Sequence, residues 1–446
     1  MAAIIFFVHP IAGSVNASLR TARELKLLGH DIYFLGLSRC KKFVPINDFN
    51  FIPLFESWFP GEDKIKEEES FVFWRKIGQR RKNIKHIEMF LDALIAGEDK
   101  EFYDVVRQIN PKIMVVVATH YDSFIWALLA YTTGINTIYL HDTLCGTQST
   151  RVPPITTGII PGESIIEQFK IILSWKKYLF NRLAKDVIYS SVLKSQLSVK
   201  TGLVKLCKHY KYPLKLIDIS TDMLAPKLKL PELVLCPKEF DFYDVERVGR
   251  YYVGASIDLH RKQPSFSWEK VDTGKPLIYC ALGSLNFLSK QERIGFFQII
   301  LDTAKQHQEW SWIVAVGDQL DDKSFIDISD NVVLVKTAPQ LNVLKKTAIM
   351  INHGGTNTIK ECILFGVPMI VFPLAFDHYG NAARVAYQGL GLKGNMSKLT
   401  SSKLTFMIMQ IQKNPYYRMQ IKIMQKKFEE ADRLNAGSSI INTFCF

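Results

Sequence analysis

Residues 337–381 decide how this chain folds, and they contain TAPQ at 337–340, NHGGTNT at 352–358, ECILFGVP at 361–368 and FPLAFDHYGN at 372–381. The apolar run 348–351 predicts a short buried strand. The two glycines after it let the backbone approach a ligand before a helix begins near Thr356. A helix N-terminus offers unpaired N–H groups to phosphate oxygens. This order of strand, glycines and helix therefore predicts a phosphate site in an α/β domain.

The polar side chains around this junction suit a ribonucleoside diphosphate. His353 at the strand end can donate a hydrogen bond to a pyrophosphate, and Glu361 can accept hydrogen bonds from both hydroxyls of a ribose. Further backbone or hydroxyl donors would come from Gly355, Thr356, Asn357 and Thr358. The alternative interpretation is an ordinary helix start, in which Thr358 and Glu361 form a capping box.

The whole series resembles the donor-binding signature of the family-1 glycosyltransferases, which include plant, antibiotic and macrolide glycosyltransferases. In the plant enzymes the signature runs WAPQ, HCGWNS, E, GVP and DQ, and the spacings agree without gaps. The resemblance implies that His353 binds the diphosphate, that Glu361 binds the ribose, and that Asp377 and His378 hold the sugar hydroxyls. Two positions depart from the signature: Thr337 replaces the tryptophan that usually stacks on the base, and His378 replaces a glutamine.

The flanking sequence continues a strand and helix rhythm. Residues 277–282, 312–316 and 332–335 predict strands, and residues 289–308 predict a helix between the first two. This rhythm implies a parallel sheet with right-handed crossovers. In the family, the Gly-Ser loop after the first strand faces the donor phosphates. The donor set implied by the resemblance is Gly283, Ser284, Thr337, Ala338, Gln340, His353, Gly355, Thr356, Asn357, Thr358, Glu361, Asp377 and His378.

The amino-terminal half repeats the rhythm, without a Gly-x-Gly-x-x-Gly fingerprint, and resembles the acceptor domain of the same enzymes. Strands are expected at 3–8, 32–35, 113–118 and 136–140, and a helix at 19–28. The family's first loop reads GHVNP, whereas this chain reads GSVNA at 13–17. Ser14 therefore occupies the place of the catalytic histidine, and an unassisted serine hydroxyl cannot take a proton near neutral pH.

Three histidines at strand ends could supply the missing base, because ligands bind at the carboxyl edge of the sheet in open α/β folds. They are His9, His120 and His141. We favour His120 assisted by Asp122, since both follow the strand 113–118 where the family carries the acid that orients its histidine. The predicted catalytic set is His120, Asp122 and Ser14.

Length and composition fit two soluble domains. The chain has 446 residues, of which 48% are apolar and 22% charged. It has no run of about eighteen apolar residues, so we expect no membrane span. The first residues lack the basic region of a signal peptide. Seven cysteines follow no metal spacing and no even disulfide framework, which favours reduced thiols and a cytoplasmic location.

Basic residues are concentrated in one part of the chain. The net charge is +13, and between residues 165 and 211 ten Lys or Arg oppose only Glu167 and Asp186. Residues 165–183 predict a basic amphipathic helix, and such helices can lie on anionic lipid. The alternative is a cationic helix packed on the first domain with solvated lysines. No base-reading module accompanies the charge, so we expect no binding to nucleic acid.

Together these patterns predict an α/β protein with the GT-B arrangement, two facing Rossmann-like domains with a cleft between them. We expect an acceptor domain over 1–235, a linker region over 236–275, a donor domain over 276–427 and a helix crossing back over 428–446. The expected activity is inverting transfer of a hexose from a UDP-sugar to a hydroxyl or other nucleophile of a small, lipophilic natural product. We expect no cofactor and no metal, and a cytoplasmic protein with possible peripheral contact to a membrane.

Other functions remain open at this level. One is a catalytically silent protein that binds a nucleotide-sugar, which Ser14 suggests directly. Another is a different GT-B enzyme, either a lipid-linked N-acetylglucosaminyltransferase or a nucleotide-sugar epimerase. Glucose and galactose, and uridine and thymidine, are also open alternatives.

Overall fold

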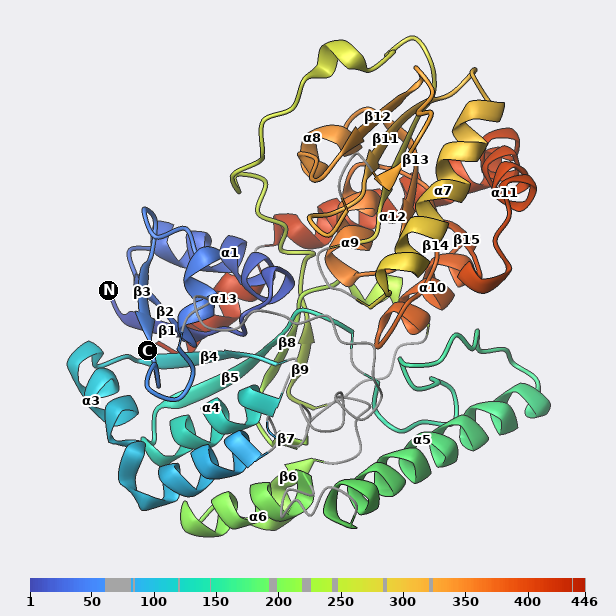
Figure 1. The fold of residues 1–446 in the computed structure, drawn as a ribbon. Helices are drawn as coiled ribbons and strands as arrows, with labels where there is room; N and C mark the ends of the chain where they lie inside the picture. Colours follow the sequence, from blue (N-terminus) through green and yellow to red (C-terminus); the bar gives the residue numbers. More distant parts are fainter. Residues whose placement is uncertain are drawn as a thin grey trace.

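A computed structural model describes residues 1–60, 82, 85–118, 121–144, 146–191, 199–218, 226–242, 248–283, 287–320, 324–434 and 436–445. The described residues form two large sheets, each with its own helices, and a long connection leads from one to the other (Figure 1). Among the described residues, no helix combines the length and the apolarity needed to cross a bilayer.

The first sheet has seven parallel strands in the order β3-β2-β1-β4-β5-β8-β9. Both faces are buried, which explains why its inner strands are continuous apolar runs. Ile5 and Phe7 pack under helices α3 and α4, whereas Ile4 and Phe6 pack under α1 and α13. The bounds are β1 (Ala3–Phe7), β2 (Asp31–Gly36), β3 (Asn50–Pro53), β4 (Ile113–Val117), β5 (Asn136–His141), β8 (Glu232–Val234), β9 (Arg250–Tyr252), α1 (Ala12–Leu27), α3 (Lys100–Ile109), α4 (Tyr121–Thr132), α5 (Ile165–Ser191), α6 (Val199–His209) and α13 (Ala436–Thr443).

The second sheet has six parallel strands in the order β12-β11-β10-β13-β14-β15. Its two faces are covered by separate apolar cores, one with α7 and α11 and the other with α9, α10 and α12. The bounds are β10 (Leu277–Ala281), β11 (Ser311–Ala315), β12 (Val332–Val335), β13 (Thr347–Asn352), β14 (Met369–Val371), β15 (Gly391–Lys393), α7 (Lys290–Gln306), α8 (Gln340–Leu344), α9 (Thr356–Leu364), α10 (His378–Tyr387), α11 (Ser401–Lys413) and α12 (Pro415–Arg433).

Smaller elements complete the two domains. Strands β6 (Ile217–Asp218) and β7 (Lys227–Leu228) form an antiparallel pair. Short 3₁₀ turns are η1 (Ser38–Lys42), η4 (Leu214–Leu216), η5 (Lys238–Phe240), η6 (Trp268–Lys270) and η8 (Met396–Lys398), and η3 (Leu94–Glu98) is a π turn.

The connections between the sheets differ in detail from the predicted boundaries. Strand β9 lies inside the predicted linker region 236–275 but joins the first sheet, so the connection begins after Tyr252. At the other end, α12 already begins at Pro415, before the predicted boundary at 428. Helix α13 then crosses back and places Ile441 in the core under α1. A strand of three residues, such as β9, is too short to show the alternation of apolar and polar residues from which strands are predicted.

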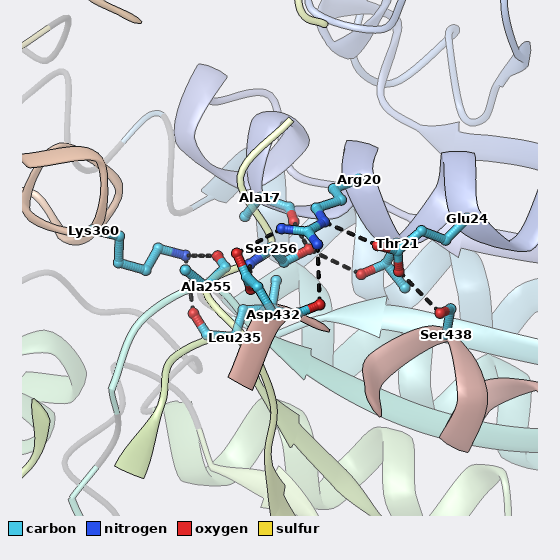
Figure 2. A network of polar contacts seen from close by, with 10 residues as sticks. All are labelled: Ala17, Arg20, Thr21, Glu24, Leu235, Ala255, Ser256, Lys360, Asp432 and Ser438. Carbon is cyan, nitrogen blue, oxygen red and sulfur yellow. Dashed lines mark hydrogen bonds and ion pairs between the residues drawn. The ribbon is translucent and has the colours of Figure 1, made fainter. Parts of the chain in front are cut away.

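Buried and partly buried polar contacts join the two domains where the chain crosses between them (Figure 2). The ammonium group of Lys360 on α9 donates to the carbonyl oxygens of Leu235 and Ala255, at 3.0 and 2.9 Å. Burial lowers the pKa of Lys360. Arg20 on α1 pairs with Asp432 at the end of α12, at 2.6 Å. Helix α9 is therefore tied directly to the first domain.

Candidate active site

A cavity of about 530 Å³ lies between the domains, at the carboxyl ends of β10, β11 and β13 and opposite the start of α1. This volume is in the range of small-molecule sites. The first domain contributes Ile11, Ala12, Gly13, Ser14, Asn16, Asp142, Thr143, Leu144, Ile155 and Thr156. Every predicted donor residue that the structure describes lines the same cavity, and Ser284 lies outside the described residues.

His353 follows β13 and is enclosed by two glycines. A Cβ atom at Gly283 would lie 2.4 Å from the imidazole ring, and one at Gly355 would lie 2.7 Å from its Nε2. Because the imidazole ring lies this close to the backbone, a side chain at either position would displace it, so both positions require glycine. His378 packs edge-on at a ring distance of 4.6 Å. Burial, with the nearby His378 and Arg293, lowers the pKa of His353 to about 3. The ring is neutral near pH 7 and can donate one hydrogen bond to an anion.

This lowered pKa gives a prediction about stability. Between pH 3 and 6.5 the unfolded chain binds a proton at residue 353 that the folded chain does not, so the free energy of unfolding falls as pH falls through this window. The contribution is at most about 1.4 kcal/mol per pH unit. We expect His353→Gln to flatten this acid-side slope in urea titrations at several pH values. The same substitution at exposed His209 is the control, and equal slope changes in both variants would contradict the prediction.

Glu361 is held in place by two side chains from other segments. Its carboxylate accepts hydrogen bonds from Nη1 of Arg261 and Nε2 of Gln340, each at 2.6 Å. The capping-box alternative is wrong, because α9 begins at Thr356 and its N-cap residue Gly355 has no side chain to accept a hydrogen bond. The buried carboxylate instead belongs to the cavity wall.

Asp377 and His378 stand at the start of α10, beside the helix that carries the phosphate signature. The Oδ2 atom of Asp377 accepts from Thr356 Oγ1 and Asn381 Nδ2, both at 2.8 Å. The Nδ1 atom of His378 accepts from the backbone N–H of Ala375 at 3.3 Å. Both predicted sugar-holding residues are therefore positioned by hydrogen bonds within the same wall of the cavity.

In the first domain, Asp122 contacts His9. His9 Nδ1 lies 2.5 Å from Asp122 Oδ2, and both side chains are 21% exposed. His9 follows β1 and Asp122 lies in the first turn of α4, and β1 and β4 are neighbours in the sheet. His120 lies outside the described residues. The pair is not itself part of the cavity lining, which begins two residues after His9, at Ile11.

The predicted loop at 13–17 is helical, because α1 begins at Ala12 instead of near residue 19. Ser14 lines the cavity, and its Oγ accepts the backbone N–H of His9 at 3.3 Å. His141 is fully buried and its Nε2 lies 3.4 Å from the carboxylate of Glu232, which also pairs with Lys227. His141 is unsuited to the role of base because its imidazole has no exposed surface.

Known proteins with similar sequence and structure are glycosyltransferases. The family model "Erythromycin biosynthesis protein CIII-like, C-terminal domain" matches residues 301–431. The NDP-glycosyltransferase YjiC of Bacillus subtilis (strain 168) is 29% identical over 238 residues, which cover 53% of this chain and 59% of the relative. The chain thus matches little more than half the length of that curated relative.

Two solved structures align along nearly the whole chain. The glycotransferase of kitacinnamycin has a TM-score of 0.68 at 18% identity and covers 99% of this chain and 98% of its own. CalG4, the calicheamicin glycosyltransferase, has a TM-score of 0.63 at 17% identity and covers 100% and 98%. The chain therefore has the GT-B fold, and part of its sequence resembles family-1 glycosyltransferases. Its predicted fold class and its resemblance to that family are both confirmed.

Two arginines of this GT-B protein were missed by the sequence interpretation. Arg293 on α7 lines the cavity although its side chain is almost fully buried, and its Nη1 donates to the carbonyl oxygen of Val316 at 3.2 Å. Arg293 lies three residues before Phe296, on the apolar face of the helix. A charged residue on such a face is unusual, and this signal could have identified Arg293 from the sequence. Arg261 lies on the interdomain connection, where the local sequence gives no such signal.

The two halves of the GT-B cleft also contact each other directly. The Nδ2 atom of Asn357, in the first turn of α9, donates to the carbonyl oxygen of Gly13 on α1 at 2.9 Å. The helix start that can bind phosphate therefore touches the first turn of α1, two residues from Ile11 in the wall that the first domain contributes to the cavity. A donor bound at α9 would lie next to an acceptor bound against α1.

Proposed function

We propose that this protein transfers a hexose from a UDP-sugar to a hydroxyl, or another nucleophile, of a small lipophilic acceptor, with inversion at the anomeric carbon. The observation that carries the proposal is the single cavity in which His353, Glu361 and the start of α9 face the first turn of α1. The two solved neighbours are named for kitacinnamycin and calicheamicin, which supports a natural product as acceptor. A cytoplasmic location is part of the same proposal.

The donor half supplies charge stabilisation from its own groups. The N-terminal N–H groups of α9 and the neutral imidazole of His353 would donate hydrogen bonds to the diphosphate. Negative charge grows on the diphosphate as the bond from its oxygen to the anomeric carbon breaks, and fixed donors aimed at that charge lower the barrier. Glu361, oriented by Arg261 and Gln340, would accept hydrogen bonds from the ribose hydroxyls.

The acceptor half needs a base, and the structure supports His9 for this role more directly than His120. A histidine whose Nδ1 is bonded to a carboxylate is held in the tautomer that has a basic Nε2. In the proposed reaction His9 takes the proton of the acceptor hydroxyl. The acceptor oxygen attacks the anomeric carbon at the same time, and UDP leaves. Asp122 would orient the ring and stabilise the imidazolium that forms.

A first test concerns the ribose. We expect the wild-type protein to bind UDP about tenfold or more tightly than 2′-deoxy-UDP, since a hydrogen bond to a charged group contributes about 1.5–3 kcal/mol. Glu361→Gln should lose this discrimination in titration calorimetry, because the amide is a weaker acceptor. Glu309→Gln, at an exposed carboxylate, is the matched control. Equal affinity of the wild-type protein for the two nucleotides would show that Glu361 does not read the ribose.

One set of product assays distinguishes a transferase from the alternative functions. A silent binding protein would bind UDP-glucose but neither transfer nor hydrolyse it. An epimerase would change the sugar and leave the nucleotide-sugar intact, whereas a transferase yields free UDP and an isolable sugar adduct. A panel containing phenols, aliphatic alcohols and lipid-linked sugars would also distinguish a natural-product acceptor from a lipid-linked one.

A further inference from the structure

Helix α5 is anchored to neighbouring described residues through the face that carries Ile171 and Trp175. Ile171 and Trp175 are buried, and the indole Nε1 of Trp175 donates to the carbonyl oxygen of Val152 at 2.8 Å. This anchors the helix at the periphery of the molecule (Figure 1). The buried contacts therefore account for the inward apolar residues of α5, and its outward residues need a separate explanation.

The outward face of α5 carries a stripe of large apolar side chains. Ile166, Phe169, Leu173, Phe180 and Val187 are spaced by three, four or seven residues, which places them on one side of a helix. Ile166 and Phe180 are each 69% exposed. At 1.5 Å per residue the stripe is about 32 Å long. Single exposed apolar residues are ordinary, but five large ones on one side of a helix indicate an interaction surface.

Cationic side chains border this stripe. Lys170, Lys176 and Lys177 are exposed on the same side of the helix. Of the described acidic side chains, Glu163 and Glu167 lie near the helix start, and Glu167 accepts a hydrogen bond from the hydroxyl of Ser164 at 2.9 Å. A face with aromatic and aliphatic groups beside lysines matches the interface of an anionic bilayer, where apolar groups enter the acyl boundary and ammonium groups meet lipid phosphates.

We propose that the outward face of α5 docks this protein in the plane of an anionic membrane. Phe169, Leu173 and Phe180 enter the interfacial region, and Lys170, Lys176 and Lys177 contact the headgroups. A second copy of the chain fits the surface less well, because a two-fold contact would bring the same lysines of both copies together. The proposal does not depend on which reaction the cleft performs.

Vesicle sedimentation tests the apolar part of this surface. Wild-type protein is expected to sediment with phosphatidylserine-rich vesicles at low salt and much less with pure phosphatidylcholine vesicles, with binding weakened by added salt. Replacing Phe169 and Phe180 together by Asp should lower the partition coefficient by at least about tenfold. The control is Phe406→Asp on α11, which is 67% exposed in the other domain and should leave binding unchanged.

A second pair of variants tests the charges. Replacing Lys170, Lys176 and Lys177 by Gln should weaken binding to anionic vesicles by about a hundredfold, since each lysine near the surface contributes about 1 kcal/mol, or about a factor of five. Replacing exposed Lys422, Lys426 and Lys427 on α12 by Gln removes the same charge elsewhere and should change little. Circular dichroism and UDP binding would verify that every variant is folded.

Two results would overturn the proposal. One is wild-type protein that stays in the supernatant with phosphatidylserine-rich vesicles at low salt. The other is a dimer, measured by light scattering, that the Phe169 and Phe180 substitutions dissociate while vesicle binding is unaffected, which would assign the face to a second copy. Weak binding by the helix variants together with normal binding by both controls would support membrane docking.

Discussion

His9→Ala is expected to lower the turnover number by about 10²–10⁴-fold, the usual effect of losing a general base. The reason is the pair that His9 forms with Asp122, at 2.5 Å. UDP affinity should be unchanged, because the donor groups lie on the second domain. Steady-state kinetics with UDP-glucose would measure the first effect, and titration calorimetry with UDP the second.

Acceptor acidity provides a readout that a merely structural role would not affect. An acidic phenol needs less help to lose its proton than an aliphatic alcohol, so the defect of His9→Ala should be smaller with the phenol. Asp122→Asn should also lower the turnover number, because the imidazole of His9 loses the carboxylate that orients it. His120→Ala is the decisive comparison: if that variant alone loses activity and His9→Ala is fully active, the base is the residue predicted from sequence.

The second large effect is expected at His353. Replacing it by alanine should lower the turnover number by about 10²–10³-fold, the range found when one fixed donor to a developing negative charge is removed. Binding of UDP should also weaken by about tenfold, whereas binding of UMP should change little, since the imidazole is aimed at the diphosphate. Kinetics and calorimetry with the two nucleotides measure these outcomes.

Gly355→Ala is a companion variant that disturbs the same ring without removing it. Its new Cβ would lie 2.7 Å from His353 Nε2, so the imidazole must move. The backbone at Gly355 has φ −64°, which alanine adopts without strain. We expect a defect of the same kind as in His353→Ala. If both variants keep normal turnover and normal UDP affinity, His353 does not contact the diphosphate.

Much of the donor half could be predicted because its signals are local. The apolar run 348–351 became β13, and the helix expected near Thr356 begins at that residue. The helix expected at 289–308 is α7, which Ser289 caps with Glu292 in a capping box. Buried parallel strands, glycines and caps each depend on a few neighbouring residues, so the sequence pattern contains nearly all the information required.

The acceptor half was less predictable because its contacts join distant residues. The segment 13–17 resembles a loop in the family but forms the first turns of α1, where Ser14 is buried. Asp122 was assigned to nearby His120, yet it lies against His9, 113 residues away in sequence. His9 and Asp122 meet because β1 and β4 are adjacent in the sheet. The order of strands in a sheet cannot be predicted from any local sequence pattern.

The sequence by itself determined two α/β units, a nucleotide-sugar signature and a basic amphipathic helix, since each follows from the periodicity and chemistry of adjacent residues. Only the tertiary structure decided which groups meet: Arg261 with Glu361, His9 with Asp122, and the start of α9 with α1. It also decided that α5 buries Trp175 and exposes Phe169 and Phe180, although all three are aromatic residues of one helix. The physical reason is that side-chain burial depends on the packing of whole elements, which the local sequence does not specify.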